Sequence, residues 1–214
     1  MQTHYDAELK DTVRYLGKTL GETIKNQLGQ EWLDRIEKIR KGGRASYQGD
    51  ATCSEELKET FKTMSDSDLL TVGRAFAQFL NLGNIAEQEY NAAMNVDASI
   101  DALFKHLDKA DLTAEKVQDA VAKLNIDLVL TAHPTEVTRR TLIHKHKELA
   151  NCLQAIHQES LNDVERKKIE TRIADLIAQA WHTEEIRSVR PTPVDEARWG
   201  FSVIENSLWE AVPD

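Results

Sequence analysis

The chain has 214 residues, of which 41% are hydrophobic and 29% charged, and its formal net charge is −9. This balance is typical of a soluble globular protein, and the excess of acids disfavours general nucleic-acid binding, which needs a basic surface. The two cysteines, Cys53 and Cys152, are isolated, which argues against a disulfide framework and suits a reducing compartment. No apolar run is long enough to span a membrane and no signal peptide is visible, so we expect a cytoplasmic protein.

The first part of the chain contains no proline and shows helical periodicity. An apolar stripe begins at Leu9 and extends to Ile39, and Gly42 with Gly43 is expected to end that helix. Residues 42–53 are polar and are expected to form a loop.

Further helices are predicted before residue 125. Ser65 and Asp68 resemble a capping box that opens a helix running to about Met94. Two shorter helices are predicted near residues 100–107 and over 113–124 from their apolar spacing.

The periodicity changes at "IDLVLTAH", residues 126–133, a short branched apolar run that predicts one parallel-type strand buried on both faces. His133 would lie at the carboxyl end of this strand, where α/β folds bind their ligands, and Pro134 restrains its backbone. A histidine can exchange a proton near neutral pH, so His133 is a candidate catalytic residue. The alternative is a turn histidine bonded to a carbonyl.

Two helices are predicted after this segment. Leu142, Leu149 and Leu153 mark the buried face of the first, and the second is predicted over 164–189. A short turn at 159–163 joins them, which favours an antiparallel hairpin.

Three arginines could form an anion site on this hairpin. Arg139 and Arg140 open the first helix, where cations oppose the helix dipole, and Arg187 lies near the end of the second. Guanidinium groups suit phosphate and carboxylate. The alternative is salt bridging to Glu136, Glu184 or a neighbouring subunit.

The last helix is predicted from a capping box at Thr192 and Asp195 with a proline between them. Phe201, Leu208 and Trp209 share one of its faces and have no evident partner in the chain. A single strand also cannot make a sheet, so either the chain pairs with something else or it is the front of a longer protein.

Two other patterns point to structure rather than to a site. Gly17 and Gly21 form a GxxxG pair that indicates close helix packing in a soluble helix. His144, His146 and His182 do not form a His-x-x-x-His pair, so a zinc site is weakly supported.

The segment "VLTAHPTEVTRRTL" (129–142) resembles the histidine signature of phosphoenolpyruvate carboxylase. "LGKTLGETI" (16–24), "AFAQFLNLGNIAEQ" (75–88) and "WHTEEIRSVRPTPVDEARWGFSVIENSLWEAVP" (181–213) resemble the bacterial branch of the same family, in the same order. Family members are several-fold longer, so the resemblance implies that this chain is only the N-terminal part.

The resemblance implies a mostly α-helical piece of a helix-rich (β/α)8 barrel. Residues 1–125 would form the helical N-terminal region. Residues 126–214 would hold the first barrel strand, the histidine loop and the following helices. The parent would be a cytoplasmic homotetramer.

The family carboxylates phosphoenolpyruvate with bicarbonate to give oxaloacetate and phosphate, which replenishes the tricarboxylic acid cycle, and it uses Mg2+ or Mn2+. His133 matches its catalytic histidine. The metal ligands belong to later parts of the family sequence, so no metal residue can be mapped here and the chain alone is expected to be inactive. The effectors include phosphorylated metabolites, which suits Arg139, Arg140 and Arg187.

Two other functions remain open from the residues. The chain could be a non-catalytic helical module for assembly or regulation, or a phosphotransfer protein with His133 as phosphate carrier. Neither needs the long block at 181–213.

Overall fold

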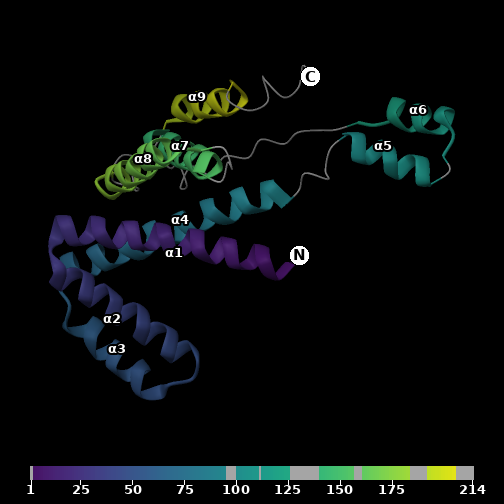
Figure 1. The fold of residues 1–214 in the computed structure, drawn as a ribbon. Coiled ribbons are helices and arrows are strands. Elements are labelled where there is room, and N and C mark those ends of the chain that lie inside the picture. Colours follow the sequence, from purple (N-terminus) through teal and green to yellow (C-terminus); the bar gives the residue numbers. More distant parts are fainter. Residues whose placement is uncertain are drawn as a thin grey trace. The chain divides into compact units, whose positions relative to one another are not determined.

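A computed structural model describes residues 2–94, 100–110, 112–125, 140–156, 161–183 and 192–205. Figure 1 shows their helices, which are α1 (Gln2–Leu28), α2 (Gln30–Tyr47), α3 (Ala51–Thr63), α4 (Asp66–Met94), α5 (Ile100–Lys109), α6 (Ala114–Ala122), α7 (Arg140–Ile156), α8 (Asp163–Trp181) and α9 (Pro193–Val203). The described residues contain no strand, so the mostly helical fold is confirmed for this part of the chain. The strand predicted over 126–133 lies outside them.

The chain divides into two compact units. The first joins Met1–Tyr90 with His144–Glu184, and the second joins Asn91–Ile143 with Glu185–Asp214. None of the helices in the described ranges is long and apolar enough to cross a bilayer.

The core of the first unit is built from α1, α2, α4, α7 and α8. Its buried side chains include Leu16, Leu20, Ile24, Ile36, Ile39, Val72, Leu82, Ile85, Leu149, Leu153, Ile173, Leu176, Ile177 and Trp181. Helix α1 packs against both α2 and α8, so it links the start of the chain to the later hairpin.

The stripe that was predicted as one helix is broken at Gly29. Gly29 has φ of +94°, a conformation that favours glycine, and its N–H donates to the carbonyl of Lys25 at 2.9 Å. The apolar spacing continues into α2 because both helices bury residues in the same core.

The prediction that Gly42 and Gly43 end the helix is wrong, and so is the loop predicted over 42–53. Helix α2 continues to Tyr47, although glycine costs about 1 kcal/mol relative to alanine inside a helix. A Cβ on Gly42 would lie 3.3 Å from the side chain of Leu57 on α3, so the glycine allows α2 and α3 to pack closely.

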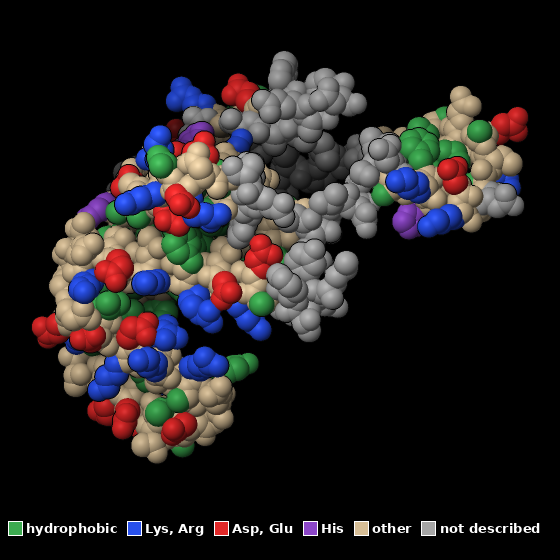
Figure 2. All heavy atoms as spheres, in the orientation of Figure 1, with side chains coloured by type: hydrophobic (Ala, Val, Ile, Leu, Met, Phe, Trp, Pro, Cys, Tyr) green, Lys and Arg blue, Asp and Glu red, His purple; other side chains and the backbone are tan. Residues whose placement is uncertain are grey.

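Helix α3 was missed because it has no fully buried residue and therefore no strong apolar stripe. Asp50 caps its start, with Oδ1 accepting from the N–H groups of Thr52 and Cys53 at 3.0 and 3.1 Å. Acidic and basic side chains interleave on the face of the first unit drawn in Figure 2. Helix α3 has an ion pair of 2.6 Å between Lys58 and Glu55.

The capping box predicted at the start of α4 is half confirmed. Ser65 Oγ accepts from the Asp68 N–H at 3.2 Å, as expected. The Asp68 carboxylate instead pairs with Arg35 of α2 at 3.1 Å, which ties α4 to α2.

The GxxxG pair marks close helix packing, as predicted. A Cβ on Gly17 would lie 3.0 Å from the ring of Phe79 on α4, and one on Gly21 would lie 3.4 Å from Leu33 on α2. The pair therefore lets α1 approach two neighbouring helices.

The two short helices predicted in the second unit are confirmed as α5 and α6. Thr113 caps α6, with its hydroxyl accepting from the Lys116 N–H at 3.4 Å. Both helices expose large apolar side chains, including Leu103, Phe104 and Val121.

Candidate functional site

Most of the predicted site residues fall outside the described structure. His133 and Arg139 belong to the segment before α7, and Arg187 belongs to the segment after Thr183. Arg140 is the first residue of α7, and its side chain is not among the described ones. The structure does describe the two helices that these segments adjoin.

Helices α7 and α8 form an antiparallel hairpin. Lys145, near the start of α7, donates to the carbonyl of Gln179, near the end of α8, at 3.2 Å. Further along α7, Glu148 accepts from Arg172 Nε at 2.7 Å. Contacts on α8 thus move toward its start as α7 proceeds, which confirms the predicted hairpin.

The extent predicted for the second helix, 164–189, is wrong at its end, because α8 stops at Trp181. The Thr183 N–H donates to the carbonyl of Ala180 at 3.0 Å, and its hydroxyl donates to that of Gln179 at 2.7 Å. These bonds tighten and close the last turn, because a threonine hydroxyl can bond backbone carbonyls near it in the chain. Arg187, which was predicted near the end of this helix, lies outside the described residues.

The hairpin is anchored to the core at the same end of α8. Trp181 is buried, and the guanidinium of Arg74 on α4 lies 5.9 Å from the centre of its ring. A cation over an indole face is attractive, so α4 holds the last residue of α8 by packing and by charge.

Helix α9 begins with the predicted capping box. Thr192 Oγ accepts from the Asp195 N–H at 3.3 Å, and the Asp195 carboxylate accepts from the Thr192 N–H at 3.0 Å. Pro193 occupies the first turn. Phe201 is 64% exposed, as predicted, whereas the other two residues of that apolar face lie outside the described residues.

The residues that the structure describes contain no group of three or more His, Cys, Asp or Glu side chains that could hold a metal ion. His144 and His182 are exposed on α7 and at the end of α8, and His146 is half-buried on α7.

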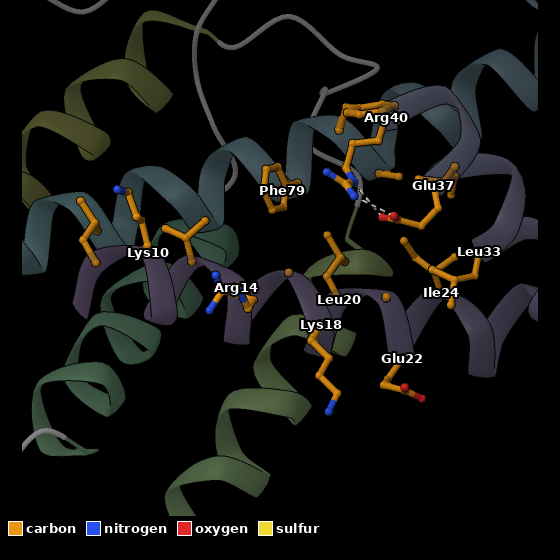
Figure 3. Close-up of a pocket in the computed structure, with 17 residues that line it drawn as sticks. Lys10, Arg14, Lys18, Leu20, Glu22, Ile24, Leu33, Glu37, Arg40 and Phe79 are labelled. Carbon is orange, nitrogen blue, oxygen red and sulfur yellow. Dashed lines mark hydrogen bonds and ion pairs between the residues drawn. The ribbon is translucent and has the colours of Figure 1, made fainter. Parts of the chain in front are cut away.

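A pocket of about 790 Å³ lies in the first unit between α1, α2 and α4. Its walls are largely apolar, and Figure 3 shows Phe79 on one side of α1 with Lys18 and Glu22 extending to the other. Arg40 donates to both carboxylate oxygens of Glu37 at its edge, at 2.8 and 2.9 Å. None of its described lining residues is a histidine or cysteine.

Sequence reasoning missed the side chains that join α7 to α8. Lys145 follows the cationic opening of α7 by a full turn, so its local sequence carried no specific signal. Its partners lie more than thirty residues away, at Gln179 and Thr183, so the pairing becomes visible only in the folded hairpin.

The family profile of phosphoenolpyruvate carboxylase matches residues 9–214. The chain belongs to this family. It is 50% identical over 214 aligned residues to the phosphoenolpyruvate carboxylase of Aeromonas salmonicida, with 97% of the chain aligned. It is 49% identical to those of Serratia proteamaculans and Salmonella typhi, with the whole chain aligned.

The chain spans about a quarter of the length of these relatives, 24% of the Aeromonas protein and 25% of the other two. The predicted membership of this family is confirmed over residues 9–214.

Proposed function

We propose that this chain is the N-terminal part of a phosphoenolpyruvate carboxylase, which converts phosphoenolpyruvate and bicarbonate into oxaloacetate and phosphate. The observation that carries this is the family match over residues 9–214, at 49–50% identity to relatives of that name. In this proposal residues 126–133 form the first strand of a (β/α)8 barrel. The parent works in the cytoplasm as a homotetramer.

The Mg2+ or Mn2+ of the family would be held by residues in later parts of the longer protein, as the family resemblance implies. A bound divalent cation supplies charge stabilisation for phosphoryl transfer.

The proposed role of His133 follows from the proton balance of the reaction. A bicarbonate oxygen attacks phosphorus and the bond to the enol oxygen breaks, which leaves carboxyphosphate and the enolate of pyruvate. Carboxyphosphate must lose its carboxyl proton as it breaks into CO2 and phosphate, and His133 takes that proton. The imidazolium then stabilises the released phosphate, and the enolate carbon attacks CO2.

Replacement of His133 by Asn in the full-length protein tests this role. We expect oxaloacetate formation, followed by coupled NADH oxidation, to be abolished, while bicarbonate-dependent phosphate release continues because phosphoryl transfer comes first. His144→Asn is the matched control, because His144 is exposed on α7. Carboxylation by His133→Asn within a few-fold of wild type would remove His133 from the mechanism.

We also propose that Arg139, Arg140 and Arg187 bind a phosphorylated effector. The antiparallel hairpin supports this, because one arginine-bearing segment leads into the start of α7 and the other follows the end of α8.

A further inference from the structure

The C-terminus of α8 lacks a cation of its own. The last turn of α8 contains no basic residue, although positive charge there would stabilise the helix dipole. Two of its terminal carbonyls accept from the backbone: Ala178 from the His182 N–H at 3.3 Å and Ala180 from the Thr183 N–H at 3.0 Å. The carbonyl of Gln179 accepts from side chains instead.

Lys145 supplies the missing charge from the neighbouring helix. Its ammonium group lies 3.2 Å from the Gln179 carbonyl oxygen and 2.6 Å from the Thr183 hydroxyl oxygen. The Thr183 hydroxyl in turn donates to Gln179 at 2.7 Å. The three groups form a closed polar network in which an α7 cation caps the negative end of α8.

The network also gives one cation of α7 a favourable neighbour. Helix α7 has no acid in its first turn, so its own dipole is not compensated there. Because the hairpin is antiparallel, Lys145 on α7 reaches the negative end of α8. Its charge is therefore favourable for α8.

We propose that Lys145 is a positioning residue that fixes the point at which the chain leaves α8 relative to the point at which it enters α7. The family signature that contains His133 ends in the first turn of α7, and the second long signature begins at Trp181. Lys145, in the second turn of α7, bonds Gln179 and Thr183 at the end of α8. The Glu148–Arg172 pair lies further along the hairpin, away from this end. Its side chains are 46% and 42% exposed.

Amide hydrogen exchange on the full-length protein tests the structural half of this proposal without any assay of activity. Lys145→Met removes the cation but keeps the apolar stem, and Thr183→Val removes the hydroxyl at constant shape. We expect each to speed exchange at residues 182 and 183 about fivefold to tenfold, the usual effect of losing a helix cap. The double variant should add little to either single change, since all three groups form one network.

Lys147→Met is the matched control, because Lys147 is an exposed lysine on the same helix. It should leave the exchange at residues 182 and 183 unchanged. Unchanged exchange in both Lys145→Met and Thr183→Val would overturn the proposal, as would equal acceleration by Lys147→Met. If Lys145→Met does not fold, the exchange rates in Thr183→Val alone test the proposal: faster exchange at residues 182 and 183 supports it, and unchanged exchange overturns it.

The second half concerns carboxylation and rests on the proposed function. Lys145→Met should lower kcat about tenfold with a smaller change in KM, because a displaced attachment point misaligns groups that act in the transition state. Lys145→Arg should restore kcat to within a few-fold, and Lys147→Met should not change it. Normal kcat in Lys145→Met, or no recovery in Lys145→Arg, would contradict a positioning role. A wild-type protein without carboxylase activity would reject the proposed function, whereas the exchange result would still decide the role of Lys145.

Discussion

Gly17 on α1 lies against the ring of Phe79 on α4, so close that an added Cβ would sit 3.0 Å from Cε2 of the ring. The two helices therefore meet at a position where even a methyl group must displace an aromatic side chain. Gly73, on the exposed face of α4, has no atom within 4 Å of the same added carbon.

This difference predicts opposite effects for the same substitution. Gly17→Ala gains helix propensity, but it overpacks the contact with Phe79, which typically costs about 1–3 kcal/mol, so we expect net destabilisation. Gly73→Ala should stabilise the chain by about 0.5–1 kcal/mol, because nothing opposes the gain in propensity. The midpoints of urea unfolding measure both. A stabilised Gly17→Ala would mean that the ring of Phe79 moves aside freely.

A second prediction concerns the reactivity of Cys53. Its thiol donates to the Asp50 carboxylate at 3.3 Å, and this hydrogen bond raises the pKa of Cys53 above its ordinary value. A raised pKa leaves less thiolate at a given pH, so alkylation is slow. Asp50→Asn keeps a good helix cap but removes the charge. We expect it to speed alkylation of Cys53 severalfold at pH 8.

Cys152 is the internal control for this measurement. Burial raises its pKa, with Glu148 as a further cause, so Asp50→Asn should not alter its rate. Mass spectrometry of the alkylated peptides separates the two thiols. Equal acceleration at both would indicate general loosening of the fold rather than a local effect on Cys53.

The sequence predicted the helices that bury an apolar face, and it failed where the deciding contact is long-range. Gly29 and Gly42 are both glycines in a helical stretch, yet only Gly29 adopts a positive φ and ends a helix. Gly42 stays helical, and Leu57 packs against it from α3. Single-sequence spacing contains no information about that neighbour.

In the candidate site, too, the local features were predicted correctly and the long-range contacts were not. The capping box at Thr192 depends on residues three apart, so it was predicted correctly. The end of α8 depends on Thr183 and on Lys145, which approaches from another helix, so it was placed too late. His133 was found from its motif and its position before a proline, and its role stays a prediction.

A third prediction concerns acid stability. The hydrogen bonds from Arg40 to Glu37, together with the charge of Arg40, lower the pKa of Glu37 below its ordinary value. The unfolded chain therefore binds a proton more readily than the folded one. The pair's contribution is fully present above the unfolded pKa of about 4.3 and is lost as pH falls through the lower folded pKa.

Comparison of wild type with Glu37→Gln checks this window. Above about pH 5 the wild type should have the higher urea midpoint, and the difference should disappear toward about pH 3. Glu87→Gln, which removes an exposed carboxylate from α4, controls for the loss of one acid. A difference between wild type and Glu37→Gln that stays constant from pH 3 to pH 6 would exclude the Arg40 pair as its source.

The last prediction concerns the proposed anion site. Arg139 and Arg187 belong to the segments that join the same end of the α7–α8 hairpin, and α7 has no acid in its first turn to neutralise them. Lys145 is already engaged with the end of α8, so it leaves the arginines as the candidate ligands of a phosphate group. A hydrogen bond to a charged group contributes about 1.5–3 kcal/mol, so the loss of two such donors should weaken binding more than tenfold.

The test changes Arg139 and Arg187 together to Gln in the full-length enzyme and titrates a phosphorylated sugar as activator. We expect the half-activating concentration to rise more than tenfold, because the phosphate group loses two charged hydrogen-bond donors. Turnover without activator should be unchanged. Arg166→Gln with Lys168→Gln removes the same charge at the opposite end of α8, where both side chains are exposed, and should leave activation unchanged. Normal activation of the Arg139 and Arg187 variant would reject the anion site. Dissociation of the oligomer, seen by sizing chromatography, would instead indicate that these arginines form salt bridges between subunits.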